Sequence, residues 1–107
     1  MTRGAAALAL FASAAVLHPA VAAGIGDADV LALVRRHCGA CHAASPTHPA
    51  MKETPKGVVL ETVADLKKHA QSSYAQTVET RAMPLGNETG MTEAERAALG
   101  RWLKANE

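Results

Sequence analysis

Residues 38–42 of this 107-residue chain read Cys38-Gly39-Ala40-Cys41-His42. Two cysteines three positions apart at the end of a helix place both sulfurs on one face, and a histidine follows directly. C-x-x-C-H is the spacing at which a c-type haem is attached, with the thiols forming thioethers and the imidazole binding the iron. The motif therefore predicts Cys38 and Cys41 as haem c attachment sites and His42 as the proximal iron ligand.

An electron-carrying haem needs a second axial ligand, and a methionine thioether is the soft ligand that pairs with histidine there. Met83 is predicted as this distal ligand, because it lies 41 residues after His42, far enough for two helices to carry the chain round the haem. Met51 lies only nine residues beyond His42 in a proline-rich loop, and Met91 directly precedes a helix cap, where an apolar residue commonly packs. Another ligand, or an open distal position, is the alternative.

The N-terminus has the pattern of a secretory signal. Arg3 gives a positive start, an apolar run covers residues 4–17, and residues 20–22 (Ala-Val-Ala) form a small-residue cleavage site. The apolar run of roughly 14 residues is shorter than the ~20 that a membrane-spanning helix needs. The sequence therefore predicts a signal peptide over residues 1–22, one domain over residues 23–107 and a periplasmic location, with an uncleaved tether as the alternative.

The expected mature chain is small and poor in aromatic side chains. Residues 23–107 number 85 and keep Tyr74 and Trp102 as the large aromatics, so the core is thin at a size where stability is already marginal. A covalent porphyrin would supply the missing apolar volume. Ten basic and ten acidic side chains leave this part without net charge, which gives no reason to expect nucleic acid or an anionic membrane surface as a partner. A monomer is expected.

Hydrophobic spacing predicts an all-α domain. A first helix, capped by Asp27 or Asp29, delivers Cys38 at its C-terminal end. Three prolines within residues 43–57 exclude a continuous helix there and predict a long loop around one edge of a planar ligand.

Two short helices are predicted next. Thr62 and Asp65 form a capping-box pattern, and Ser72 or Ser73 is expected to start the second of these helices. Met83 then falls in a loop, because the residue before a proline is pushed out of the helical region.

The last helix is the best defined element in the sequence. Thr92 is its expected cap, and Glu95 completes a capping box. Its predicted buried residues recur at helical spacing and are Ala98, Leu99, Trp102 and Leu103. Trp102 is expected to pack against the first helix or the haem edge. The predicted fold therefore has four to five helices wrapped around one covalent haem, with the N- and C-terminal helices crossing.

In the order of its motifs the chain resembles a class I cytochrome c over essentially all of residues 23–107. The C-x-x-C-H motif is followed by Met83-Pro84 and then by a terminal helix that carries an aromatic residue. A narrower similarity is to the C-terminal cytochrome c domain of bacterial membrane-bound urate hydroxylases. It rests on residues 81–92 (RAMPLGNETGMT), with supporting similarity at residues 45–49, 95–96 and 99–102.

The resemblance implies Cys38 and Cys41 as thioether sites, His42 as proximal ligand and Met83 as distal ligand of one haem c. It also implies a redox protein as donor, either a urate-oxidising membrane protein or an unrelated dehydrogenase. The implied acceptor is a terminal oxidase or another cytochrome of the respiratory chain. Those hydroxylases have a multi-helix membrane domain where this chain has a signal peptide, so the expected function is outer-sphere electron transfer and not urate oxidation.

Three other interpretations of the motif remain open. A C-x-x-C dithiol acts in thiol redox proteins but belongs in a βαβ context. A zinc site would combine Cys38, Cys41 and two of His42, His48 and His37, at a spacing that fits no common finger; otherwise His48 is expected to serve the loop. A haem sensor or haem enzyme would need a distal position that is open or easily vacated.

The remaining polar groups are assigned structural or solvent-facing roles. The basic clusters at residues 35–37 and 67–69 are expected to be solvated helix faces, with a docking patch for an acidic redox partner as the alternative. His37 and His69 are accordingly expected to be exposed. Asn87 is a candidate for a hydrogen bond within the Met83 loop.

Overall fold

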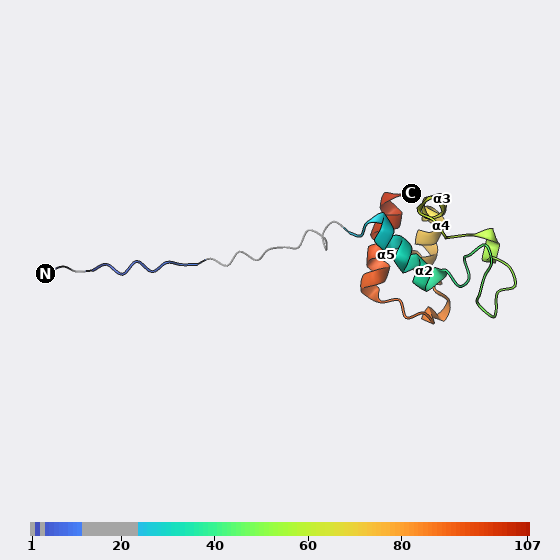
Figure 1. The fold of residues 1–107 in the computed structure, drawn as a ribbon, viewed down its shortest axis with the longest axis horizontal. Helices are drawn as coiled ribbons and strands as arrows, with labels where there is room; N and C mark the ends of the chain where they lie inside the picture. Colours follow the sequence, from blue (N-terminus) through green and yellow to red (C-terminus); the bar gives the residue numbers. More distant parts are fainter. Residues whose placement is uncertain (1, 3, 12–23) are drawn as a thin grey trace.

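The computed structural model describes residues 2, 4–11 and 24–107. Within these residues the regular structure is helical and no strand is present, which confirms the predicted all-α class. The α-helices are α2 (Asp27–Cys38), α3 (Val63–Lys68), α4 (Ala70–Tyr74) and α5 (Glu93–Ala105) (Figure 1). A π-helical segment, Ala75–Glu79, continues α4, and 3₁₀ turns lie at Pro55–Gly57 and Leu85–Asn87.

The predicted end of the signal peptide lies outside the residues that the structure describes. The cleavage site at residues 20–22 falls in the segment 12–23, so the boundary stays a prediction. Residues 4–11 carry no regular secondary structure, and their large apolar side chains are exposed, namely Leu8, Leu10 and Phe11. In the described part of the chain, no helix combines the length and the apolar character that crossing a membrane requires.

The start of α2 differs from the prediction. Gly26 is the N-cap, and its carbonyl accepts a hydrogen bond from Val30 N–H at 3.0 Å. Asp27 and Asp29 lie in the first turn, where carboxylates favour the positive end of the helix dipole, but no side chain caps the helix. The predicted aspartate cap is therefore wrong. Asp27 Oδ1 instead accepts a hydrogen bond from Trp102 Nε1 at 2.9 Å, which ties the start of α2 to α5.

α3 begins at the predicted capping box. Asp65 N–H donates to Thr62 Oγ1 at 3.1 Å, and Thr62 N–H donates to Asp65 Oδ2 at 3.1 Å. The main-chain N–H of Glu61 also donates to this carboxylate and is the first cause that lowers the pKa of Asp65 below its ordinary value. The box satisfies main-chain donors that have no partner within the helix.

A single non-helical residue, His69, separates α3 from α4, so α4 begins at Ala70. His69 has φ −106° and ψ 18°, and its carbonyl accepts hydrogen bonds from Ser73 N–H at 2.9 Å and from Ser72 Oγ at 3.2 Å. The Ser72 hydroxyl thus bonds back to a carbonyl instead of capping a new helix. The predicted start at Ser72 or Ser73 is therefore wrong, and His69, expected to be exposed, is half-buried between the two helices.

α5 is confirmed as predicted. Thr92 N–H donates to Glu95 Oε1 at 3.0 Å, and Glu95 N–H donates to Thr92 Oγ1 at 3.1 Å. Its buried apolar side chains are Leu99, Trp102 and Leu103, with Ala98 half-buried. α2 runs across α5 and packs against it (Figure 1).

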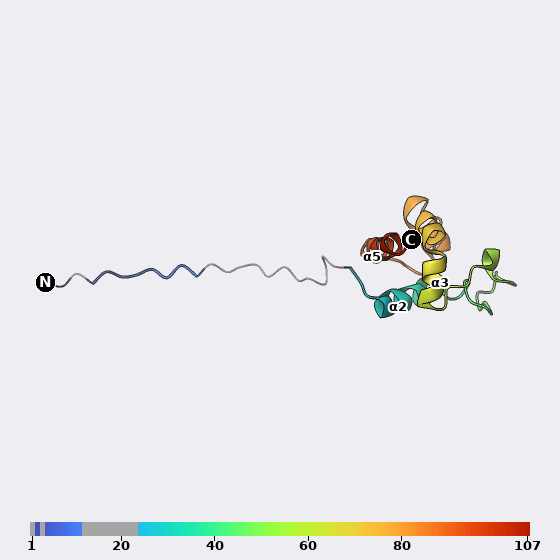
Figure 2. The same cartoon turned by 90° about the horizontal axis from the view of Figure 1, so that it is seen from above.

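The hydrophobic core lies between α2, α3, α4 and α5, in which α2 packs against α3 and α5, and α4 packs against the same two helices. Seen from above, these helices surround a common centre (Figure 2). The buried apolar side chains of the core are Val30, Leu33, Val34, Leu60, Leu66, Ala70, Met91, Leu99, Trp102 and Leu103. All of them belong to the predicted mature domain, and α5 contributes three of them.

Gly100 marks a close approach of α5 to the preceding helical segment. A Cβ atom at this position would lie 2.9 Å from Val78 Cγ2 and 3.7 Å from Tyr74 Cε2. The first distance is shorter than van der Waals contact, so a larger side chain would push α5 away from this segment.

Gly100→Val should lower the free energy of unfolding by about 1–3 kcal/mol, the usual cost of overpacking, even though valine is a better helix former than glycine. Chemical denaturation would measure the change. Ala97→Val is the control, because Ala97 is exposed on the same helix and should cost roughly half a kcal/mol or less. Equal effects of the two substitutions would contradict tight packing at Gly100.

Candidate functional site

The C-x-x-C-H motif folds as a turn directly after α2. The carbonyl of Cys38 accepts hydrogen bonds from Cys41 N–H at 3.2 Å and from His42 N–H at 2.8 Å. Gly39 N–H donates to Arg35 O at 3.2 Å, and a Cβ atom at position 39 would lie 2.5 Å from that oxygen. The turn therefore requires glycine at position 39 and gathers the two cysteines and the histidine at the end of α2.

Hydrogen bonds orient both the ring and the main chain of His42. Its Nδ1 lies 2.8 Å from the carbonyl oxygen of Val58. Because a carbonyl can only accept, Nδ1 carries the proton and Nε2 keeps its lone pair. The carbonyl of His42 accepts a hydrogen bond from Leu60 N–H at 2.8 Å. This arrangement leaves Nε2 free to bind a metal and fixes the direction of the ring.

Two adjoining cavities, here called the site cavities, bring the predicted residues together. The smaller, of about 60 Å³, is bounded in part by Cys38, Cys41, His42 and Met83. The larger, of about 320 Å³, shares Cys38, His42 and Met83 with it. The apolar walls of the larger cavity include Val34, Val58, Leu60, Leu66, Leu99 and Leu103. Cys38, His42 and Met83 thus border both of these largely apolar cavities, and Cys41 borders the smaller one.

Met83 lies in the loop between the π-helical segment and the 3₁₀ turn at Leu85–Asn87, as predicted. Its N–H donates to Gln76 O at 3.0 Å, and its carbonyl accepts from Arg96 Nη1 at 2.8 Å. The peptide bond to Pro84 is cis. Both main-chain polar groups of Met83 are therefore bonded, and its half-buried side chain lines both site cavities.

The other two methionines of this domain have different positions. Met91 is 3% exposed and packs in the core, and its main chain is held by Asn87, whose Oδ1 and Nδ2 bond Met91 N–H and Met91 O at 3.0 and 3.1 Å. The predicted role of Asn87 within this loop is confirmed. Met51 lines the smaller site cavity; its short separation from His42 in the sequence argued against it as the distal ligand.

The two cysteine thiols lie in surroundings that disfavour the thiolate. Burial raises the pKa of Cys38 to about 11, with the neighbouring Cys41 as the second cause. Burial and then the charge of Glu88 raise the pKa of Cys41. Reactive dithiols need the opposite, a lowered pKa. The electrostatics of the motif therefore give no support to a thiol redox centre.

The zinc interpretation likewise gains no support from the geometry. In the part of the chain that the structure describes, no group of three or more His, Cys, Asp or Glu side chains is placed to hold a metal ion together. His37, one of its proposed ligands, bonds instead to Thr89 and Glu95, and His48 bonds to Glu88. A four-ligand site built from Cys38, Cys41 and these histidines is thus not assembled.

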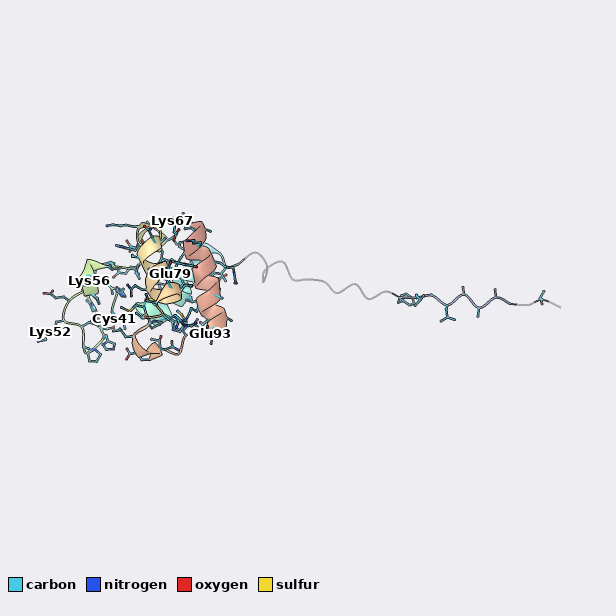
Figure 3. The ribbon with its side chains drawn as sticks, turned by 180° about the vertical axis from the view of Figure 1, so that it is seen from behind. Cys41, Lys52, Lys56, Lys67, Glu79 and Glu93 are labelled. Carbon is cyan, nitrogen blue, oxygen red and sulfur yellow. The ribbon has the colours of Figure 1, made fainter. Side chains whose placement is uncertain are left out.

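The long loop after the motif is tied across the smaller site cavity by His48. Its Nδ1 accepts a hydrogen bond from Ala50 N–H at 3.1 Å, so Nε2 carries the proton and donates to Glu88 Oε1 at 2.6 Å. Glu88 follows the Met83 loop, and both partners line the cavity. His48 therefore serves the loop, in agreement with the prediction. Figure 3 shows Cys41 beside this loop, which also carries Lys52 and Lys56.

His37 is buried, with 6% of its surface exposed, and the prediction of an exposed residue is wrong. Its Nδ1 lies 2.8 Å from Thr89 Oγ1, and its Nε2 lies 3.2 Å from Glu95 Oε2. The neighbouring Arg35 and Arg36 are exposed. The prediction that residues 35–37 form one solvent-facing group therefore holds for these two arginines and fails for His37. His37 lies on the inner side of α2 and joins that helix to the start of α5.

Arg96 was not identified as a site residue from the sequence. It is 6% exposed and donates to the carbonyl of Met83. A signal was present, because Arg96 stands three residues before Leu99 and seven before Leu103, the spacing of the buried face of α5. Because arginine is charged, a solvent-facing position was the simpler interpretation, and the helical spacing of Arg96 with Leu99 and Leu103 was not used.

Comparison of the chain with protein-family models, with curated proteins and with solved structures finds no match. The functional interpretation therefore depends on the residues of the site. Their protonation, their bonding partners and their shared apolar cavities are the observations that it uses.

Glu95 should make the stability of the fold depend on pH. Hydrogen bonds from the main-chain N–H of Thr92 first, and from His37 second, lower the pKa of Glu95 from 4.5 to about 2. A carboxyl whose pKa is lower in the folded chain stabilises the fold above its unfolded pKa, and this stabilisation is lost as the pH falls through the folded pKa. Glu95→Gln should therefore destabilise the fold at pH 7, with a difference that shrinks between pH 4.5 and 2.

Denaturation curves at a series of pH values would measure this difference. Glu79→Gln is the control, because Glu79 is exposed at the end of the π-helical segment. A deficit of the Glu95→Gln variant that stays constant from neutral to acid pH would contradict the role of the carboxylate.

Proposed function

We propose that this chain is a mono-haem c-type cytochrome that carries electrons by outer-sphere transfer. The observation that supports the proposal is the convergence of Cys38, Cys41, His42 and Met83 on adjoining apolar cavities. Two thiols, an imidazole and a thioether are the groups that attach a haem c covalently and bind both axial positions of its iron.

The residues present fit that group in protonation and polarity. Nε2 of His42 has a free lone pair, since Nδ1–H donates to Val58 O. The thioether of Met83 is a neutral, soft ligand suited to the haem iron of an electron carrier. Leucine and valine side chains wall the larger site cavity, and an apolar porphyrin packs favourably against such surfaces. Cys38 lines this cavity as well, and Cys41 lines the smaller one beside it.

When bound, the haem would supply a one-electron centre that alternates between ferric and ferrous iron. His42 and Met83 would hold the iron as its two protein ligands, which would leave no position on it for a substrate. The apolar side chains around the larger cavity would disfavour additional positive charge on a bound haem and so would favour its reduced form. Hydrogen bonds to the His42 ring and to both main-chain groups of Met83 limit their displacement when the charge changes.

The same proposal extends to the fold, as a class I cytochrome c arrangement. In it α2 would deliver the thiols, the loop before α5 would present the methionine, and α5 would cross α2. The packing of these two helices and the hydrogen bond from Trp102 to Asp27 support this assignment.

The proposed location is the periplasm, where haem c is attached, with residues 1–22 acting as the export signal. The proposed donor is a dehydrogenase or a urate-oxidising membrane protein, on the similarity of residues 81–92 to urate hydroxylase cytochrome domains. The proposed acceptor is a terminal oxidase or another cytochrome. Electron transfer without bond formation makes the chain a carrier and not an enzyme.

Production in a host with haem c maturation should give a protein whose haem stays attached through a denaturing gel. The double variant Cys38→Ser, Cys41→Ser should lose the covalent haem, because no thioether can form. Haem staining of the gel measures attachment. A wild-type chain that carries no covalent haem under these conditions would reject the proposed cofactor and return weight to the dithiol and zinc interpretations.

Met83→Ala should abolish the weak charge-transfer band of ferric methionine ligation, lower the reduction potential and open the iron to external ligands, because a soft ligand is removed. Visible spectra and a redox titration would measure these changes. Met51→Ala is the matched control, since Met51 also lines the smaller site cavity, and it should keep the band. The ligand assignment fails if Met83→Ala leaves the band and the potential unchanged.

A further inference from the structure

Arg96 is a buried cation on the face of α5 that looks toward the Met83 loop. Only 6% of its surface is exposed. None of the ion pairs formed by residues 24–107 includes Arg96. Burying a charge without a carboxylate partner costs free energy. The groups to which the Arg96 guanidinium donates hydrogen bonds should therefore explain why it is buried.

The guanidinium joins two segments through main-chain carbonyls. Its Nη1 donates to Thr77 O in the π-helical segment at 2.6 Å and to Met83 O at 2.8 Å. Its Nε is buried and has no hydrogen-bond partner. Charge-assisted hydrogen bonds are stronger than neutral ones, and one nitrogen thus connects α5, the π-helical segment and the Met83 loop.

The carbonyl of Met83 receives this bond while its N–H donates to Gln76 O. Met83 is therefore fixed on one side to the π-helical segment and on the other to α5. The side chain of Met83 lines the site cavities, whereas Arg96 itself does not contribute to their walls. Any effect of Arg96 on the site must pass through the main chain of Met83.

We propose that Arg96 is a positioning residue that holds the Met83 main chain so that its thioether faces the site cavities. The inference rests on the proposed function, because the position of the thioether matters there as an iron ligand. Loss of Arg96 would leave the carbonyls of Thr77 and Met83 without their donor, and the Met83 loop would move away from the iron more readily.

The test compares Arg96→Leu and Arg96→Lys with Arg101→Leu and Arg101→Lys in the haem-loaded protein. Arg101 is exposed on the same helix, so its substitution changes charge without touching the Met83 loop. The measurements are covalent haem content, the ferric methionine charge-transfer band, and the affinity of the ferric protein for imidazole, which competes with the thioether for the iron.

Arg96→Leu should keep covalent haem but weaken the band and raise the imidazole affinity about tenfold, which corresponds to ~1.4 kcal/mol, the size of a hydrogen bond from a charged donor. Arg96→Lys should have a band intensity and an imidazole affinity between those of Arg96→Leu and the unchanged protein. Lysine keeps a charged donor, but its ammonium group reaches a different position. Both Arg101 variants should match the unchanged protein.

An imidazole affinity of the Arg96 variants equal to that of the Arg101 controls would overturn the inference, even if thermal stability falls, since that result describes a merely structural residue. Should Arg96→Leu give no folded haem protein, Arg96→Lys decides by the same comparison. Absence of covalent haem or of the band in the unchanged protein would instead reject the proposed function, so the two failures are distinguishable.

Discussion

Two hydrogen bonds between His42 and the segment 58–60 control the geometry of the site. One fixes the proton of the imidazole on Nδ1, and the other ties the His42 main chain to Leu60. They close the proline-containing loop at its base, so the course of the loop has little influence on the direction of Nε2. The same turn carries Cys38, which lines both site cavities, and Cys41, which lines the smaller one. Without the bond to Val58 O, the ring of His42 would have no fixed direction relative to the site cavities.

α5 completes the arrangement from the opposite end of the sequence. Its first turn bonds His37 of α2 through Glu95, its middle reaches the Met83 loop through Arg96, and its last turns pack Trp102 and Leu103 in the core. One helix thus contacts both the element that carries the thiols and the loop that carries the thioether. A displacement of α5 would disturb both halves of the site together, which makes the Gly100 contact relevant to function as well as to stability.

The features that the sequence predicted correctly depend on neighbouring residues. The capping boxes at Thr62 and Thr92, the buried face of α5 and the non-helical position of Met83 are all set within a few residues, where propensity and spacing act. The errors arise where distant segments decide. The carboxylate of Asp27 accepts a hydrogen bond from Trp102 and does not cap α2. His37 can be buried because its ring nitrogens form hydrogen bonds with Thr89 and Glu95. The convergence of the four predicted site residues agrees with the motif, whereas the haem and its ligation remain proposals.

The hydrogen bond between Trp102 and Asp27 joins residues 75 positions apart, and it affects when the chain can fold during its synthesis. A ribosome that has produced residues 24–90 has made α2 and the C-x-x-C-H motif but none of α5, so the nascent chain lacks four of its buried core side chains, namely Met91, Leu99, Trp102 and Leu103. Contacts of high sequence separation cannot form until their later partner exists. Because synthesis runs from the N-terminus to the C-terminus, the domain cannot complete its core until α5 has been made.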